Sequence, residues 1–245
     1  MNICCLAGNL QSMDKKPKIL VVEDEAAIRN GLIDVLIFHG FDVDDTDNGT
    51  DGLKLAKTGL YDLILLDVML PGITGFEICN TIRTLDREQP IIILTAKSSD
   101  EDIIEGLTLG ADDYIAKPFS VAQLILRIKA VLRRTHNDWD NDNHIKFNDS
   151  STIDLLNMSG EINDKSVIFT RRETDILRYL YLNQHRPVPR DELLSKLWGY
   201  SREMDIETRT VDIHIAKLRK KIELMPSNPQ FLMTIRGAGY KLVFK

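Results

Sequence analysis

The sequence predicts two domains: an α/β domain built on a doubly wound parallel sheet, followed by a smaller α+β domain. Up to Arg134 the chain alternates apolar runs with helical periods five times, which is typical of a parallel sheet covered on both faces. From His144 onward, short alternating segments separated by turn residues replace this pattern and indicate a small antiparallel sheet. Charge changes at the same place, with 12 basic and 20 acidic residues in 18–134 but 17 basic and 13 acidic residues in 144–245.

The first domain is expected to contain five strands and five helices. The apolar runs predict strands at 18–22, 42–46, 62–66, 91–95 and 114–116, and the amphipathic periods predict helices at 26–38, 50–57, 76–85, 100–109 and 121–134. Gly40, Gly59 and Gly110 follow predicted helices, where a left-handed residue commonly ends the helix. Asp100 and Ser120 are expected to cap the last two helices at their amino ends.

Composition limits the class of protein. The 245 residues suffice for two ordinary domains, and 43% hydrophobic with 28% charged residues is usual for a globular chain. No apolar stretch approaches the ~18 residues that span a bilayer, and no secretory leader is recognisable, so a cytoplasmic protein without membrane contact is expected. The three cysteines match no metal or disulfide framework, and Cys79 falls on an apolar helical face. We expect an extension at 1–17, domains at 18–134 and 144–245, and an Asn/Asp-rich linker at 135–143.

Chemically active residue types follow four of the predicted strands. Glu23 and Asp24 follow the first, Asp67 the third and Lys117 the fifth, while Thr95 ends the fourth. The carboxyl ends of parallel strands meet at one edge of the sheet, where ligands bind. Each residue alone has an ordinary explanation, as a surface charge or a loop cap. Together, three carboxylates would repel one another unless a cation joined them, and all-oxygen ligands favour Mg²⁺.

The second domain combines a small sheet, three helices and a terminal hairpin. Strand-like segments occur at 145–147, 152–155, 160–162 and 166–169, helices are predicted at 170–183, 190–197 and 208–224, and the hairpin pairs 233–236 with 240–244. Thr170 and Glu173 form a capping-box pattern. In the third helix an apolar stripe should face the core (Val211, Ile215, Leu218, Ile222) and leave other residues off it (Arg209, Ile213, Lys217, Lys220, Lys221). A basic helix of this kind fits the major groove of DNA, although a solvated lysine-rich helix has the same pattern.

These motifs resemble a known family. The segments Val21-Val22-Glu23-Asp24-Glu25, Leu66-Asp67-Val68-Met69-Leu70-Pro71-Gly72, Leu94-Thr95-Ala96 and the run from Gly110 to Phe119 are similar to response-regulator receiver domains, whose fold is flavodoxin-like. The second half resembles the winged helix-turn-helix domain of the OmpR/PhoB family, with the wing at residues 236–240. The resemblance covers residues 18–245 and implies a phosphorylation-dependent transcription regulator of a two-component system rather than an enzyme.

The resemblance assigns roles in the receiver domain. Asp67 would accept a phosphoryl group from a sensor histidine kinase, while Thr95 and Lys117 contact it and Tyr114 acts as a switch. Mg²⁺ would be held by Asp24, Asp67 and the backbone carbonyl of Met69, with Glu23 acting through a water. The Lys117–Pro118 peptide is expected to be cis. Phosphorylation would produce a homodimer through the pairs Asp112–Arg127 and Asp113–Arg134, whereas a third family pair is absent because its positions hold Ile103 and Gln123.

The resemblance also implies a contact set for double-stranded promoter DNA. Lys217 and Thr210 would approach base edges and Ile213 a thymine methyl, while Arg236 enters the minor groove. The remaining predicted contacts are to phosphates: Arg209, His214, Arg219 and Tyr240. The loop at 198–207 contacts RNA polymerase in some relatives.

Two other functions fit the same sequence features. One is an aspartate-nucleophile phosphatase, but that class carries a second acid two residues after the nucleophile, where this chain has Met69. The other is an atypical regulator that binds DNA without phosphorylation, because an acidic cluster with a lysine does not by itself demonstrate phosphotransfer.

Overall fold

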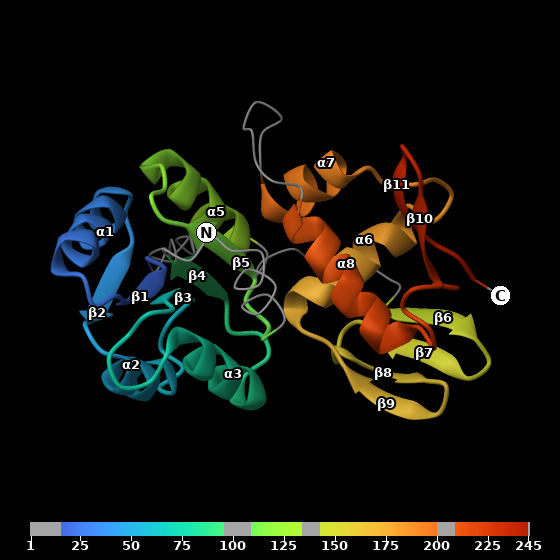
Figure 1. Cartoon of the computed structure of the whole chain (residues 1–245), viewed down its shortest axis with the longest axis horizontal. Helices are drawn as coiled ribbons and strands as arrows, with labels where there is room; N and C mark the ends of the chain where they lie inside the picture. Colours follow the sequence, from blue (N-terminus) through green and yellow to red (C-terminus); the bar gives the residue numbers. More distant parts are fainter. Residues whose placement is uncertain (1–15, 96–108, 134–142, 200–208, 245) are drawn as a thin grey trace, which may run out of the picture.

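A computed structural model describes residues 16–95, 109–133, 143–199 and 209–244, except for the side chains of Thr95, Arg133 and Arg209. Two globular parts lie side by side (Figure 1). Several expected segments lie partly or wholly outside the described residues: 1–15 of the extension expected at 1–17, 100–108 of the helix expected at 100–109, Arg134, 135–142 of the linker and 200–207 of the loop expected at 198–207. No helix among those described is long and apolar enough to cross a membrane.

The first part is the expected doubly wound sheet, in the order β2-β1-β3-β4-β5 with every pairing parallel. Its strands are β1 (Lys18–Val22), β2 (Asp42–Thr46), β3 (Leu63–Asp67), β4 (Ile91–Thr95) and β5 (Asp113–Ala116). Its described helices are α1 (Ala26–Phe38), α2 (Gly49–Ala56), α3 (Gly75–Leu85) and α5 (Val121–Arg133). The strand order reverses between β1 and β3, which is where such sheets bind ligands.

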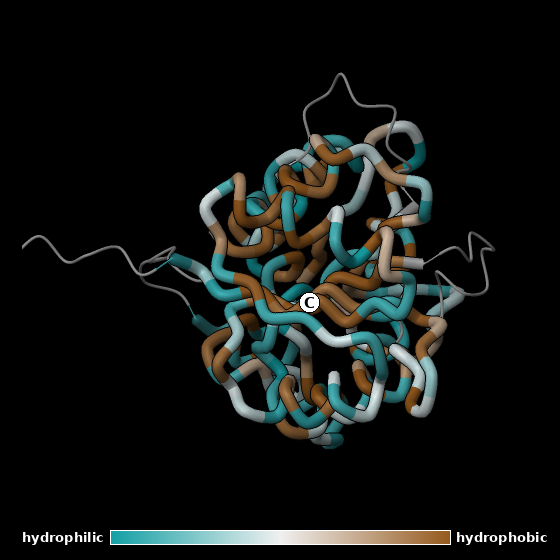
Figure 2. The backbone as a smooth tube through the Cα atoms, turned by 90° about the vertical axis from the view of Figure 1, so that its left-hand side faces the viewer, coloured by the Kyte–Doolittle hydropathy of each residue, from teal (hydrophilic) through white to brown (hydrophobic). Residues whose placement is uncertain are grey.

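Two apolar layers cover the two faces of this sheet. Successive strand residues point to opposite sides, so Leu20 and Val22 join the cluster under α2 and α3, whereas Ile19 and Val21 join the cluster with α1 and α5. Figure 2 shows hydrophobic residues gathered along the inner segments of the tube. β3 is buried throughout, including Asp67, which the sequence placed just past the strand and the structure makes its last residue.

The second part begins with the antiparallel sheet β6-β7-β8-β9. These strands are β6 (His144–Asn148), β7 (Ser151–Asp154), β8 (Ser159–Ile162) and β9 (Lys165–Ile168), followed by α6 (Arg171–Leu182), α7 (Arg190–Leu193), η2 (Leu194–Trp198), α8 (Arg209–Ile222), β10 (Leu232–Ile235) and β11 (Gly239–Leu242). The capping box of Thr170 and Glu173 is confirmed. The helix expected at 190–197 is instead one α-helical segment that widens into the π-helix η2 and ends at Gly199, with φ 73°.

The expected core stripe of α8 is confirmed, because Val211, Ile215, Leu218 and Ile222 all belong to the core of the second part. The β10–β11 hairpin is attached next to it through a bridge between Val188 and Tyr240. Gly239 makes this close approach possible: its φ is 120°, and a Cβ there would lie 2.0 Å from the carbonyl oxygen of Val188. The hairpin is therefore fixed against the helical layer rather than projecting independently.

Candidate phosphoacceptor site and DNA-facing surface

The structure brings the three predicted acids together. Carboxylate oxygens of Glu23, Asp24 and Asp67 lie within 4.8 Å of one another at the carboxyl edge of the sheet. Glu23 and Asp67 are buried, while Asp24 is exposed. β1 and β3 are neighbours in register, from Ile19 opposite Leu63 to Val22 opposite Leu66, and this pairing aligns their acidic ends.

Lys117 completes the cluster from the end of β5. Its Nζ lies 2.6 Å and 2.9 Å from the two carboxylate oxygens of Glu23 and 3.4 Å from Oδ1 of Asp67. The expected cis peptide between Lys117 and Pro118 is confirmed. The ammonium is thus held mainly by Glu23, beside the carboxylate that the sequence selects as the nucleophile.

The electrostatics of the cluster fit a divalent cation. Burial raises the pKa of Asp67 and of Glu23, and the nearby Lys117 opposes the rise in both. Within the described part of the chain, the buried Oδ1 of Asp67 has no hydrogen-bond partner. This buried carboxylate oxygen, which has the Lys117 ammonium 3.4 Å away and two further carboxylates nearby, matches the oxygen-rich surroundings that Mg²⁺ prefers.

The close approach of α3 constrains the end of β3, where Asp67 lies. Gly75 starts α3 so close to the strand end that a Cβ there would lie 2.0 Å from the carbonyl oxygen of Asp67. Its N–H donates to the carbonyl of Val68. Met69, whose carbonyl the family resemblance assigns to the metal, has an exposed side chain.

Arg29 also shapes the site, and the sequence analysis missed it. Its guanidinium donates to the backbone carbonyls of Glu23 and Asp24, at 2.8 Å and 3.2 Å, and pairs with Asp45 at 3.1 Å. Arg29 therefore holds the acidic loop against α1 and β2. Its place on the first turn of α1, facing a loop of acids, was the only signal that could have indicated this role.

Thr95, the predicted phosphoryl contact, is only partly described, whereas Tyr114, the predicted switch, is described in full. Thr95 ends β4 opposite Ala116, as expected, but its side chain lies outside the described set. Tyr114 is buried in the apolar cluster on the α3 side of the sheet.

The residues expected at a dimer interface have partners within this chain. Asp112 pairs with Arg83 at 2.9 Å, and Asp113 pairs with Arg127 at 3.0 Å. The sequence assigned Arg127 to Asp112 of a second copy, whereas here its guanidinium is fixed by Asp113 and by the carbonyl of Tyr114. Arg134 lies outside the described residues, and Gln123 is half-buried on α5.

Some residues predicted to contact DNA are exposed or half-buried, whereas others hold α8 against the hairpin. Arg236 is exposed at the tip of the β10–β11 hairpin, and Thr210 is half-buried at the start of α8. Arg219 and Tyr240 link α8 to the hairpin: Arg219 donates to the carbonyl of Leu232 and the hydroxyl of Thr234, and the Tyr240 hydroxyl bonds to Asp212. The side chain of Arg209 lies outside the described set.

Three residues of α8 are not available to DNA in this structure, contrary to the expectation. Ile213 belongs to the apolar cluster of the first part, and His214 is fully buried. Lys217 has only 11% of its side chain exposed and lies 3.4 Å from Glu173. The reason is tertiary: on the face of α8 that the sequence leaves open, Ile213 packs into the apolar cluster of the first domain, together with Cys79 of α3, Ala111 and Tyr114.

Comparisons with known proteins agree with both halves. Residues 19–129 match the family described as response regulator receiver domain, and residues 164–242 match transcriptional regulatory protein, C terminal. The chain is 40% identical over 233 residues to the probable transcriptional regulator ycf27 of Guillardia theta, covering 93% of this chain and 91% of that protein. This chain belongs to the OmpR/PhoB family of response regulators.

Other relatives support the same assignment. The sensory transduction protein RegX3 of Mycobacterium tuberculosis is 38% identical over 225 residues, covering 91% of this chain and 98% of that protein. Among solved structures, a RitR mutant superposes with a TM-score of 0.70 at 27% identity, covering 94% of this chain and all of that one. The OmpR/PhoB homologue DrrB of Thermotoga maritima is 32% identical with a TM-score of 0.50, covering 94% of this chain and 100% of that one.

Proposed function

We propose that this response regulator is switched by phosphorylation of Asp67, which causes the receiver domains to dimerise and the winged-helix domains to bind tandem promoter half-sites. The observation that carries the proposal is the cluster of Glu23, Asp24, Asp67 and Lys117 at one edge of the sheet, in a chain that also carries a winged-helix domain. The donor would be the phosphohistidine of a sensor kinase. Half-sites about one DNA turn apart would suit such a dimer.

The geometry supports transfer to Asp67. A carboxylate oxygen of Asp67 attacks the phosphorus, the bond to the histidine nitrogen of the donor breaks, and an acyl phosphate remains on the chain. Phosphoryl transfer depends mainly on positioning and charge neutralisation. Lys117 lies 3.4 Å from Asp67 and supplies a positive charge, and Thr95, at the end of β4, is the candidate donor to a phosphoryl oxygen. A Mg²⁺ ion held by Asp24, Asp67 and the Met69 carbonyl, with Glu23 acting through a water, would neutralise the remaining charge.

The test is phosphorylation with acetyl phosphate and Mg²⁺, followed by intact mass measurement and DNA binding. The native chain should gain one phosphate and bind its operator more tightly, whereas Asp67→Asn should gain neither property. Asp34→Asn, which changes an exposed carboxylate on α1, is the matched control and should behave like the native chain. Equal labelling of native protein and Asp67→Asn would refute the site assignment.

The same experiment separates the alternatives. A phosphatase would release phosphate continuously rather than retain one group per chain. A regulator independent of phosphorylation would bind DNA equally well as native protein and as Asp67→Asn. Because Met69, two residues after Asp67, carries an exposed apolar side chain, we expect it to hinder water and the acyl phosphate to persist. Decay within seconds in excess Mg²⁺ would contradict that expectation.

A further inference from the structure

A carboxylate lies near the start of α8, the helix that is predicted to enter the major groove of DNA. Asp212 is in the first turn of this helix, and 44% of its side chain is exposed. An unpaired acid at this place would repel DNA, whose duplex carries one negative charge per ~1.7 Å of its axis. The acid therefore needs a cationic partner, and the chain supplies one from a different helix.

The partner is Arg190, the first residue of α7. Its Nε donates to Oδ1 of Asp212 at 2.7 Å, and its Nη2 donates to the hydroxyl of Tyr240 at 2.8 Å. The Tyr240 hydroxyl in turn donates to the same Oδ1 of Asp212. The planar guanidinium can make both donations at once, whereas a lysine ammonium is a single point charge. The three side chains form a closed ring of hydrogen bonds, called the Arg190 cluster below.

The Arg190 cluster joins α7, α8 and strand β11 of the terminal hairpin. The guanidinium carbon of Arg190 lies 4.7 Å from the centre of the Tyr240 ring, and that of Arg219 lies 5.9 Å from the same ring. Guanidinium groups at such distances are attracted to an aromatic face. Burial, with the hydrogen bond to Asp212, raises the pKa of the Tyr240 hydroxyl to about 12, so the hydroxyl keeps its proton at neutral pH. It therefore remains a donor to Asp212.

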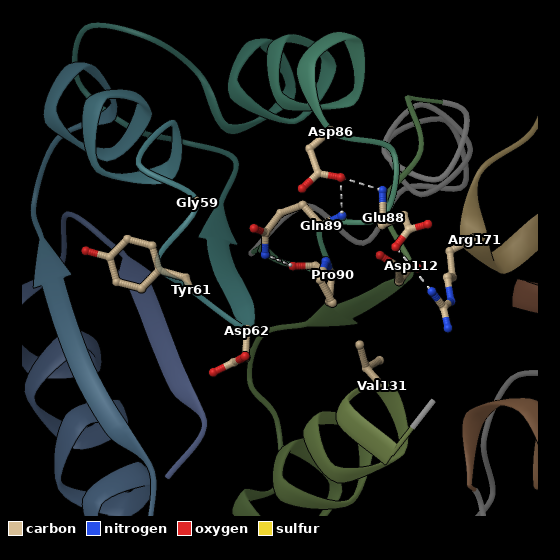
Figure 3. A pocket seen from close by; sticks show the side chains of 10 residues that line it. All are labelled: Gly59, Tyr61, Asp62, Asp86, Glu88, Gln89, Pro90, Asp112, Val131 and Arg171. Carbon is tan, nitrogen blue, oxygen red and sulfur yellow. Dashed lines mark hydrogen bonds and ion pairs between the residues drawn. The ribbon is translucent and has the colours of Figure 1, made fainter. Parts of the chain in front are cut away.

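The Arg190 cluster differs from an ordinary ion pair on the surface. Arg171 and Glu88 form such a pair, 3.4 Å apart beside a hollow of about 210 Å³ (Figure 3). Exposed pairs of this kind contribute little to stability. Arg190 instead makes two hydrogen bonds and a ring contact, and only 34% of its side chain is exposed. Its guanidinium is therefore fixed in one place by two different elements.

Two other links hold the hairpin, and they reach different parts of it. Arg219 of α8 donates to the carbonyl of Leu232 on β10, at 2.9 Å and 2.7 Å. The backbone groups of Val188 and Tyr240 exchange hydrogen bonds of 2.7 Å and 2.9 Å. Without the Arg190 cluster the hairpin would keep these attachments, but β11 would lose its side-chain connection to the first turn of α8. The angle between the hairpin and α8 could then change.

We propose that Arg190 is a positioning residue for DNA binding. Through Asp212 and Tyr240 it sets the angle between α8 and the β10–β11 hairpin. At that angle α8 and Arg236, which is exposed at the tip of the hairpin, reach the same duplex together. This inference rests on the DNA binding of the proposed function, but it does not depend on the phosphorylation of Asp67.

Removal of the Asp212 carboxylate tests the proposal through the sign of the effect. The probe is a DNA duplex selected from a random pool by the native full-length chain treated with acetyl phosphate and Mg²⁺. If Asp212 were an ordinary surface acid, Asp212→Ala would tighten binding, because repulsion of the phosphates falls. We expect instead at least a fivefold loss of affinity. Asp191→Ala, which removes an exposed acid next to Arg190, is the matched control and should cause no loss. Binding by Asp212→Ala that equals or exceeds native binding would overturn the proposal.

A double-mutant cycle shows whether the hydroxyl of Tyr240 acts through Asp212. Tyr240→Phe keeps the ring beside Arg190 but removes the hydroxyl, and should weaken binding to the selected duplex severalfold in the native background. In the Asp212→Ala chain the same change should cost less than twofold, because the partner of the hydroxyl is already gone. An equal loss in both backgrounds would mean that the hydroxyl contacts DNA directly, which contradicts the positioning role.

Variants of Arg190 itself separate positioning from a general loss of folding. In the Arg190→Gln chain, Arg236→Ala should weaken binding less than it does in the native chain, because a displaced hairpin no longer brings Arg236 to the duplex. The salt dependence of binding should also fall by about one phosphate contact. Partial unfolding would lower the apparent affinity and leave both quantities unchanged, and that result would overturn the proposal. Arg190→Lys keeps the charge without the fork, so it should resemble Arg190→Gln rather than the native chain.

Labelling of Asp67 by acetyl phosphate in every variant keeps the two proposals apart. Variants of the Arg190 cluster should gain one phosphate as readily as the native chain, because their defect lies in the second domain. If no chain were labelled while the DNA results came out as expected, the proposed phosphorylation of Asp67 would fail and the role of Arg190 would stand. Normal labelling with unaltered DNA binding in the Arg190 variants would have the opposite meaning.

Discussion

At the scale of single residues, His214 shows how far the structure departs from a simple view of a basic DNA-binding helix. The family resemblance places it among the phosphate contacts, but its ring is buried 5.5 Å from the ring of Trp198. Burial, with the positive charges of Arg172, Lys217 and Lys221 around it, lowers its pKa far below the ordinary 6.5. The imidazole is therefore neutral in the folded chain at neutral pH.

This neutral histidine should make folding sensitive to acid. Below pH 6.5 the unfolded chain binds a proton at this position and the folded chain does not, so stability falls as the pH falls. Between pH 7.5 and 5.5 the native chain should lose about 1.4 kcal/mol more stability than His214→Gln, which cannot titrate. Urea unfolding at both pH values measures the difference. Identical losses in the two proteins would mean that His214 gains its proton without cost in the folded chain.

At the scale of elements, close contacts between backbones decide where the functional side chains lie. α3 starts against the end of β3 because Gly75 has no Cβ, and α2 starts in the same way, since a Cβ at Gly49 would lie 1.7 Å from the carbonyl oxygen of Ile73. A capping box then fixes the start of α3, and the side chain of Asn48 caps the start of α2. The loop after Asp67 is consequently enclosed between two helices that begin at glycines.

Gly75→Ala should therefore displace the strand end that carries Asp67. The new Cβ would meet backbone atoms, which cannot rotate away, so we expect a loss of about 1–3 kcal/mol in stability and slower labelling by acetyl phosphate. Gly31→Ala is the matched control, because nothing lies within 4 Å of a Cβ there on α1. That change should stabilise the helix by about 0.5–1 kcal/mol. If the two alanine variants unfold at the same denaturant concentration, the close approach of α3 is not a real constraint.

At the scale of the whole molecule, the two domains share buried surface, because Ile213 of α8 joins the apolar cluster of the first domain. The dimer proposed for the phosphorylated chain would instead depend on ion pairs between two copies. The resemblance leaves the dimer with two of the three family ion pairs, because Ile103 and Gln123 cannot form the third. Exposed ion pairs contribute ~0–1 kcal/mol each. Loss of one pair should weaken the dimer without abolishing it.

Restoring that pair should accordingly have a small effect. In the phosphorylated full-length chain, Ile103→Lys with Gln123→Glu should lower the dimer dissociation constant by roughly fivefold or less, the equivalent of about 1 kcal/mol. Sedimentation at a series of protein concentrations measures the constant, and either single change alone serves as the control. A gain of a hundredfold would show that the pair is buried in the dimer and that the present interface lacks a main contact.

Much of this architecture followed from the sequence alone. Alternating apolar runs set the five strands and the parallel sheet, and strand ends in that sheet necessarily bring Glu23, Asp24, Asp67 and Lys117 to one edge. The capping box at Thr170 and the core stripe of α8 were equally readable, because both depend on neighbours only three or four positions apart. Arg29 escaped notice because its partners are backbone carbonyls, which no side-chain pattern reveals.

Tertiary structure alone decided what α8 faces. The sequence could leave Ile213 and Lys217 off the core of their own domain, but it could not show that a second domain covers them. The hydrogen bonds from Arg172 and Trp198 to the backbone carbonyl of Asp112 join residues 60 and 86 positions apart. Every residue has such a carbonyl, so no sequence pattern marks this acceptor. Local periodicity reports which side of an element is apolar. The partner that buries that side is chosen only when distant parts of the chain meet.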